Sequence, residues 1–302
     1  MNLDRLVTEA VNERSKHLDA LDTLEMVRVI NEEDKLVALA VEKVLPEIAQ
    51  AVDIIAAAMK TGGRLFYIGA GTSGRLGVLD ASECPPTFGV SPDLVQGIIA
   101  GGYPALVRSS EGTEDSADEG RKDLHEYGVR AGDVVVAIAA SGRTPYCIGA
   151  LEEAKRLGAR AIALTCNPDS EMSRVAELTI APVVGPEVIM GSTRMKSGTA
   201  QKMVLNMLST GAMVKLGKVY GNLMVDVQPS NSKLVERAKR IIAQAAGVDR
   251  ATAEKAFEAA GRQVKVAVVM CLTGADAAAA RDALEQCDGY VRRAAELLTR
   301  EG

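Results

Sequence analysis

Three short segments of the chain combine glycine with hydroxyl and basic side chains. They are Gly-Ala-Gly-Thr-Ser-Gly-Arg at 69–75, Ala-Ser-Gly-Arg-Thr-Pro at 140–145 and Gly-Ser-Thr-Arg-Met-Lys at 191–196. Glycine lets the backbone approach a ligand closely, and the N-terminus of a following helix adds free N–H groups and a partial positive charge. Such segments favour an anion site, most simply a phosphate site. One such loop is equally typical of helix capping, but three in one chain favour phosphate binding.

The first of these segments also matches the G-x-G-x-x-G pattern, through Gly69, Gly71 and Gly74. In a dinucleotide site, an acidic residue about 20 positions later, at the end of the next strand, binds the ribose hydroxyl. Here that strand ends in Ile-Ile-Ala-Gly at 98–101, without an acid. The chain also lacks the G-x-x-x-x-G-K-[ST] pattern of nucleoside triphosphate sites. We therefore expect no nucleotide cofactor.

Two glutamates have the types and positions of an acid–base pair. Glu83 precedes Pro85 and Pro86, which we expect to end a helix that begins at Ser73, so the helix dipole disfavours the charge of Glu83. Glu114 follows Thr113, which we expect to be an N-cap, so the dipole favours its ionised form. Two carboxyl groups with opposite preferences suit an acid and a base in one site. The alternative is two solvated acids, because the chain has 40 acidic residues.

The elements that would position these residues are short apolar runs at 63–69, 94–100, 134–140, 159–166 and 178–184. Most are separated by stretches long enough for a helix, which predicts a parallel sheet with helices on both faces. Residues 134–139 are apolar throughout, as in a strand buried on both faces. In such sheets, ligands bind beyond the carboxyl ends of the strands, where the first two glycine segments lie.

Helical patterns flank this central region. The first sixty residues and 199–215 have helical spacing, and Pro229 marks a break before an Ala-rich helical end. We expect an N-terminal helical segment at 1–54, an α/β domain at 55–228 and a helical C-terminal domain at 229–302. Within the last of these, 247–298 should form a compact three-helix module with a packing or lid role. The expected helix ends are at Gly247, Gly261, Gly274 and Gly289.

Composition excludes several classes of protein. The 302 residues are 47% hydrophobic, carry a net charge of −5 and include only 3% aromatics, which argues against a nucleic-acid surface. The five cysteines are widely spread, and we expect them to be reduced in a cytoplasm. Two histidines and no C-x-x-C motif give no metal site. No apolar run approaches the roughly 18 residues of a membrane span, and the N-terminus has no apolar leader.

The three glycine segments, together with Leu-Asp-Ala-Ser-Glu-Cys-Pro-Pro at 79–86 and Gly-Asn-Leu-Met-Val-Asp at 221–226, resemble the N-acetylmuramic acid 6-phosphate etherase family. The resemblance covers essentially the whole chain. It implies a sugar isomerase (SIS) domain with a flavodoxin-like parallel sheet, in a cytoplasmic homodimer without metal or nucleotide. The implied lyase reaction converts the 6-phosphate of N-acetylmuramic acid to N-acetylglucosamine 6-phosphate and D-lactate, during amino sugar catabolism and peptidoglycan recycling.

The same resemblance assigns individual residues. It places the catalytic glutamates at Glu83 and Glu114. It places the substrate-binding groups in the three glycine segments, at Thr72, Ser73, Ser141, Thr144, Ser192, Arg194 and Lys196. The last three could bind the sugar or the lactyl carboxylate, or cap the long helix that follows. One departure is Ala139, where many isomerase relatives have the first serine of S-x-S-G-x-T.

The implied chemistry is an elimination followed by hydration. In the open-chain sugar, carbon 2 is α to the aldehyde and carbon 3 carries the ether oxygen. We expect Glu114 to remove the carbon 2 proton and Glu83 to protonate the departing lactate oxygen, before water adds. Two alternatives remain open on this fold. One is an aldose–ketose isomerase, which needs the same acidic proton but no leaving group, and the other is a sugar-phosphate sensor similar to the glucokinase regulatory protein.

Overall fold

The computed structural model describes residues 7–108, 112–229 and 231–301, so the predicted lack of an apolar leader at 1–5 lies outside the described residues. The chain divides into two compact units. One comprises Met1–Ser82 and Pro92–Ser209, and we call it the sheet unit; the other comprises Glu83–Ser91 and Thr210–Gly302, and we call it the helical unit. The predicted domain boundaries after residues 54 and 228 differ from this division. They stay predictions.

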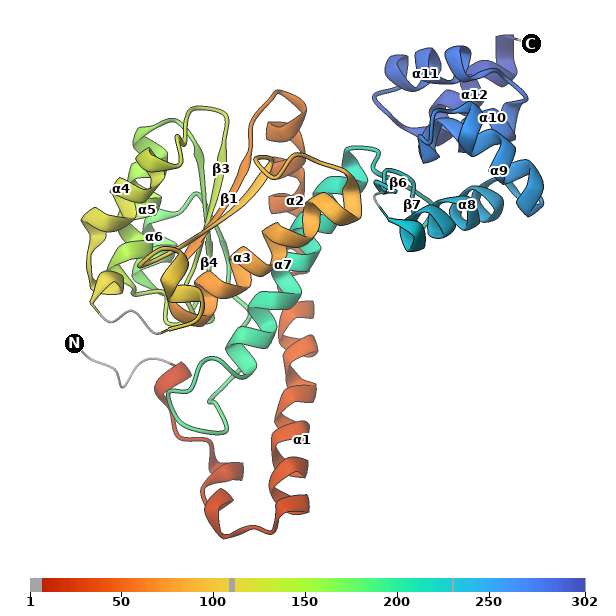
Figure 1. The fold of residues 1–302 in the computed structure, drawn as a ribbon. Coiled ribbons are helices and arrows are strands. Elements are labelled where there is room, and N and C mark those ends of the chain that lie inside the picture. The colour runs from red at the N-terminus through yellow and green to blue at the C-terminus, as the bar shows by residue number, and fades with distance from the viewer. Residues whose placement is uncertain (1–6, 109–111, 230, 302) are drawn as a thin grey trace. The chain divides into compact units, whose positions relative to one another are not determined.

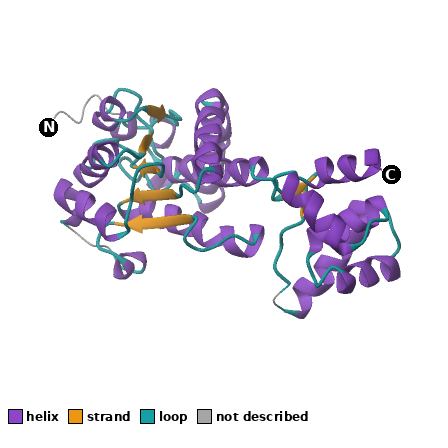
Figure 2. Cartoon of the chain, turned by 90° about the horizontal axis from the view of Figure 1, so that it is seen from above, coloured by secondary structure: helices purple, strands orange, loops and turns teal. Residues whose placement is uncertain are grey.

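The sheet unit is built on five parallel strands in the order β2-β1-β3-β4-β5 (Figures 1 and 2). This is the flavodoxin-like order, so the expected fold class is confirmed. β1 and β3 are buried throughout, as the apolar run at 134–139 predicted. β5 is shorter than expected, with three residues. The strands are β1 (Leu65–Gly69), β2 (Val95–Ile99), β3 (Val134–Ile138), β4 (Arg160–Leu164) and β5 (Leu178–Ile180).

Helices cover both faces of this sheet (Figure 1). Phe66 and Ile68 of β1 point to one face and pack in a core with α4, α5 and α6, whereas the neighbouring residues point to the other face. On that other face α3 approaches closely, because Gly77 leaves room for the Tyr67 side chain. The helices of this region are α1 (Thr23–Glu42), α2 (Leu45–Lys60), α3 (Gly71–Phe88), α4 (Ala117–Glu126), α5 (Pro145–Arg156), α6 (Glu171–Val175) and α7 (Lys196–Lys215). Short 3-10 helices are η2 (Val7–Glu9), η3 (Glu13–Ser15), η4 (Leu18–Ala20), η5 (Tyr103–Leu106) and η6 (Thr113–Asp115).

The expected bounds of the helix around Glu83 are wrong at both ends. α3 begins at Gly71 rather than at Ser73, and it runs through Pro85 and Pro86 to Phe88. A proline removes one helical N–H donor and crowds the carbonyl four residues earlier. Both prolines lie in the last turn of α3, so few bonds of the ladder are affected. The turn beyond them is closed by the Gly89 N–H, which donates to the Pro85 carbonyl at 2.9 Å.

The helical unit contains α8 (Ser232–Ala246), α9 (Arg250–Ala259), α10 (Val264–Thr273), α11 (Ala277–Gln286) and α12 (Val291–Glu301), after a small hairpin of β6 (Val219–Tyr220) and β7 (Leu223–Met224). Its core contains most of α10, with Phe257 and Leu284 from its neighbours. Gly247 and Gly274 end α8 and α10 in the left-handed conformation, as predicted. The expected three-helix module at 247–298 is wrong. It has four helices, which are separated at Gly261, Gly274 and Gly289, the helix ends that were expected.

Candidate active site

A cavity of about 400 Å³ lies at the carboxyl ends of β1 and β3. These strands are neighbours, and the chain leaves them toward opposite edges of the sheet, so the cavity is at the topological switch point. Its lining brings together five predicted residues: Thr72, Ser73, Glu114, Ser141 and Thr144. The lining residues all belong to the sheet unit.

The first glycine segment forms the tight passage from β1 into α3. A Cβ atom on Gly74 would lie 2.5 Å from the Gly69 carbonyl oxygen and 2.7 Å from Cγ1 of Ile99. Gly71 has a φ of +53°. These close approaches explain the G-x-G-x-x-G pattern through helix–strand packing, without a dinucleotide. The same geometry places Thr72 and Ser73 in the first turn of α3, whose N-terminus carries a partial positive charge.

The second glycine segment leads from β3 into α5. Gly142 has a φ of +67°, and a Cβ atom there would lie 2.4 Å from the Ser170 side chain. The Ser141 hydroxyl accepts a hydrogen bond from the Arg143 N–H at 3.3 Å. Thr144 is the N-cap residue of α5, but its side chain makes no capping hydrogen bond. Its hydroxyl can therefore form a hydrogen bond with a ligand, which favours a binding role over a capping role for Thr144.

The third glycine segment contributes to the cavity through Gly191 and Thr193. Ser192, Arg194 and Lys196, which the resemblance singled out, do not line it. Arg194 is exposed, whereas Lys196 is only 1% exposed and its ammonium lies 2.7 Å from Glu33 Oε2. This ion pair favours the structural alternative for Lys196. The binding roles of Ser192, Arg194 and Lys196 stay predictions.

Buried carboxylates hold the third segment in place. Glu187 accepts hydrogen bonds from the backbone N–H groups of Lys196 and Ser197, both at 2.9 Å, and so caps α7. Glu33 also accepts hydrogen bonds from Asn12 Nδ2 at 2.8 Å and from Arg14 Nη1 at 3.0 Å. Burial acts to raise the pKa of Glu33, but the hydrogen bonds from Lys196 and Asn12 outweigh it and lower that pKa.

Glu114 lines the cavity from the 3-10 turn η6. The prediction that Thr113 is the N-cap residue of the helix that contains Glu114 is wrong. Thr113 is the first residue of η6, Gly112 precedes it with a φ of 93°, and the Ser116 hydroxyl caps α4 by accepting from the Glu119 N–H at 3.2 Å. Gly112, rather than Thr113, therefore occupies the N-cap position before this turn. Glu114 nevertheless lies in a first helical turn, as expected.

Glu83 is exposed and does not line this cavity. It lies on the part of α3 that belongs to the helical unit, ten residues after Ser73, which corresponds to about 15 Å along a helix axis. Its catalytic role therefore stays a prediction from the resemblance.

Three charged residues of the cavity lining were not predicted as site residues: Glu9, Asp115 and Arg143. Arg143 forms an ion pair with Glu171 at 3.2 Å, and its place between Gly142 and Thr144 was a signal that could have identified it. Glu9 has no such signal. The segment before it is anchored by a hydrogen bond from the Val7 N–H to Asn167 Oδ1 at 3.1 Å, a contact across 160 residues.

Other chemistry finds little support in the described part of the chain. It contains no group of three or more His, Cys, Asp or Glu side chains that could hold a metal ion. Burial raises the pKa values of Cys147 and Cys166 to about 12, so these thiols stay protonated at neutral pH and are poor nucleophiles. None of the described helices is both long enough and apolar enough to cross a bilayer.

Comparisons with known protein families identify the class to which this fold and cavity belong, the SIS domains. Residues 117–211 match the SIS domain model, and residues 47–155 match the model of the glucokinase regulatory protein N-terminal SIS domain. A phosphoheptose isomerase from Francisella tularensis is similar in structure, with a TM-score of 0.48 and 16% identity over 64% of this chain and 100% of that one.

Curated relatives then give the particular family. A protein of Symbiobacterium thermophilum named N-acetylmuramic acid 6-phosphate etherase is 64% identical over 274 residues, which cover 91% of each chain. A protein of Serratia proteamaculans with the same name is 59% identical over 294 residues, 97% of this chain and 99% of the other. The chain belongs to the N-acetylmuramic acid 6-phosphate etherase family.

Proposed function

We propose that this protein cleaves the D-lactyl ether of N-acetylmuramic acid 6-phosphate and releases N-acetylglucosamine 6-phosphate and D-lactate. The observation that carries the proposal is the cavity in which two phosphate-type loops meet Glu114. Family membership supports the choice of substrate, because relatives 64% and 59% identical bear the name of this etherase. The reaction would serve the recycling of cell-wall amino sugars.

The phosphate of the substrate would bind between the N-termini of α3 and α5. Both are long helices whose first turns line the cavity, so their dipoles favour an anion there. Thr72, Ser141 and Thr144 add hydroxyl groups, whereas the Ser73 hydroxyl donates to Gln201 Oε1 at 3.0 Å and would have to turn toward the phosphate. Arg143 adds a cation at the same end, although it already pairs with Glu171.

Glu114 would remove the proton from carbon 2 of the open-chain sugar, which the neighbouring aldehyde acidifies. The bond between carbon 3 and the ether oxygen then breaks, and that oxygen leaves as lactate after it receives a proton. Water adds its hydroxyl to carbon 3, and a proton returns to carbon 2. Each positioned proton transfer contributes roughly 10²–10⁴ in rate. Glu83 is our candidate acid on the family resemblance alone, while Glu9 and Asp115 are the further carboxylates that line the described cavity.

The proposal extends to a cytoplasmic homodimer that binds no nucleic acid. Support for a dimer comes from α1, which exposes Leu24, Val27, Leu36 and Leu39. Apolar side chains gathered on one helix are typical of a surface covered by a partner. The five cysteines are free thiols, which suits a reducing compartment. The net charge of −5 disfavours nucleic acid.

Release of D-lactate from purified protein tests the activity. We expect lactate from N-acetylmuramic acid 6-phosphate and none from the unphosphorylated sugar. Absence of lactate together with thermal stabilisation by the sugar phosphate would replace the proposal with the sensor. Interconversion of aldose and ketose phosphates without lactate would replace it with the isomerase.

A further inference from the structure

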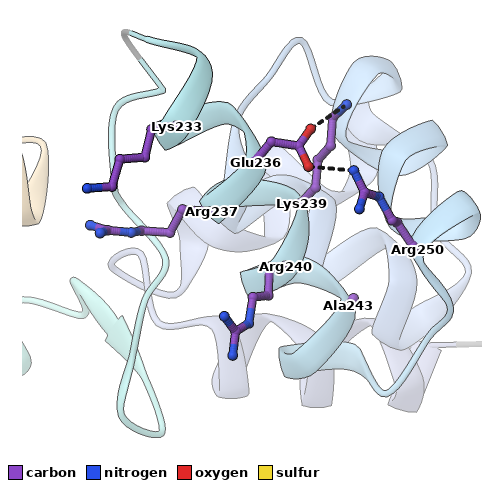
Figure 3. Close-up of a pocket in the computed structure, with 7 residues that line it drawn as sticks. All are labelled: Lys233, Glu236, Arg237, Lys239, Arg240, Ala243 and Arg250. Atoms are coloured by element: carbon purple, nitrogen blue, oxygen red, sulfur yellow. Dashed lines mark hydrogen bonds and ion pairs between the residues drawn. The ribbon is translucent and has the colours of Figure 1, made fainter.

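The helical unit has a surface of unpaired cations on α8. Lys233, Arg237 and Arg240 are exposed and have no hydrogen-bond or ion-pair partner among the described residues. They follow one another at intervals of four and three residues, so they share one face of the helix. With Ala243 and three charged neighbours, they line a hollow of about 490 Å³ (Figure 3).

The other two cations that line the hollow, Lys239 and Arg250, form ion pairs with acidic side chains. Lys239 lies 2.5 Å from Glu254, and Arg250 lies 2.5 Å from Glu236. Figure 3 shows Glu236 turned toward Lys239 and Arg250, and away from Arg237. One side of α8 is therefore charge-balanced, and the other carries three positive charges without a counterion in the described part of the chain.

This arrangement opposes the stability of α8. Lys233 lies in the first turn, where the helix dipole disfavours a cation, and no acidic residue accompanies it there. Like charges four residues apart also repel each other. The opposite face of α8 is anchored through Ala238, Ile241 and Ile242, which are buried in the core of the helical unit. The helix thus holds the three cations at a fixed surface.

The charge distribution of the chain supports a role for this surface. The chain as a whole carries a net charge of −5, yet the helical unit has 14 Lys and Arg residues against 12 Asp and Glu. Arginine forks match the oxygens of phosphate groups, and a lysine adds a point charge. A dianion would relieve the mutual repulsion of the three side chains and the cost of Lys233 at the helix start.

We propose that Lys233, Arg237 and Arg240 form a binding site for a small phosphorylated anion. The ligand is a phosphate monoester or inorganic phosphate, which share the dianionic group that the three cations recognise. The site consists of residues of the helical unit alone, so it stands whether or not the chain has etherase activity.

The test uses the full chain and the arginine side-chain Nε–H signals in NMR spectra, assigned with Arg237→Lys and Arg240→Lys. We expect inorganic phosphate to shift both signals saturably. An equal response to N-acetylglucosamine 6-phosphate would show that the phosphate group suffices, whereas tighter binding of the ester would identify a phosphorylated sugar as the ligand. Saturating inorganic phosphate without movement of either signal would overturn the proposal.

Variants make the test specific. Arg237→Ala should weaken phosphate binding, followed on the Arg240 signal, at least tenfold, and Arg237→Glu should abolish it. Lys255→Ala is the matched control, because it removes an exposed cation from the neighbouring helix α9. It should change the affinity less than twofold. Equal losses in Arg237→Ala and Lys255→Ala would mean that only net charge matters, and would also overturn the proposal.

Discussion

The ammonium group of Lys196 lies 2.7 Å from a carboxylate oxygen of Glu33, and both side chains are almost completely buried. Lys196 is the first residue of α7, and Glu33 lies on α1, 163 residues earlier. The pair thus fixes the end of the segment from which Gly191 and Thr193 reach the cavity. Lys196, whose binding role stays a prediction, anchors the loop from which two residues line the cavity.

Removal of one partner of this pair should destabilise the fold strongly. Lys196→Met leaves the buried Glu33 carboxylate with Asn12 and the exposed Arg14 as its partners, and we expect a loss of about 3 kcal/mol in the free energy of unfolding, the lower end of the range for a broken buried pair. The double variant Glu33→Gln, Lys196→Met should recover part of that loss. Urea denaturation measures both. Equal stability of Lys196→Met and the wild type would show that the pair contributes nothing.

The same pair predicts a pH dependence of stability. The pKa of Glu33 is lower in the folded chain than its ordinary value of 4.5, because its hydrogen bonds outweigh its burial. The unfolded chain therefore takes up a proton first as the pH falls. The stabilisation by ionised Glu33 is complete above pH 4.5 and disappears as the pH falls through the folded pKa. The stability difference between wild type and Glu33→Gln should narrow over that range, and a constant difference would contradict this origin.

Substitution of Glu114 should separate catalysis from binding. Glu114→Gln keeps the size and polarity of the side chain but removes the base, so we expect a decrease in kcat of at least about a hundredfold with an almost unchanged affinity for the sugar phosphate. Glu83→Gln, Glu9→Gln and Asp115→Asn, measured alongside, identify the acid as the second position where kcat falls and binding persists. Loss of binding in Glu114→Gln would make this residue a substrate ligand.

The hydroxyl of Thr144 should contribute to phosphate binding rather than to helix stability, because it does not cap α5. Thr144→Val should lower sugar-phosphate affinity about three- to tenfold, the usual effect of one lost hydrogen bond. Thr144→Ser should restore most of it. Titration calorimetry gives the affinities, and thermal unfolding provides the control. A drop in melting temperature with unchanged affinity would assign Thr144 to the fold.

Two glycines at equivalent places in helices should respond differently to alanine. In Gly74→Ala the new methyl group would meet the Gly69 carbonyl oxygen at 2.5 Å, so α3 must move away from β1 and stability should fall by more than about 1 kcal/mol. In Gly198→Ala the nearest atom is Thr72 Cγ2 at 3.4 Å, an ordinary contact. The higher helix propensity of alanine should leave that variant as stable as the wild type or more so. Thermal unfolding of both variants measures these changes. Equal melting temperatures of Gly74→Ala and Gly198→Ala would show that close packing does not require glycine at position 74.

The sequence by itself determined the framework of the sheet unit. Buried parallel strands are nearly continuous apolar runs, so β1 and β3 were located to within two residues by composition alone. The helix ends at Gly247 and Gly274 were equally local, because a left-handed residue there favours glycine. The two loops of the cavity followed from the rule that ligands bind at the carboxyl ends of such strands.

Only the tertiary structure decided which of the predicted site residues line the same cavity. Lys196 is buried against Glu33, and the turn that carries Glu9 is held by a hydrogen bond from Val7 to Asn167. Both partners are distant in the sequence, so the residues around Lys196 and Glu9 do not predict these positions. The structure also shows that α3 continues past Pro85 and Pro86 to Phe88, where the local pattern predicted an end. Local spacing fixes helices and strands because their hydrogen bonds are local. The partners of a side chain are fixed by packing between segments distant in the sequence, which no local pattern encodes.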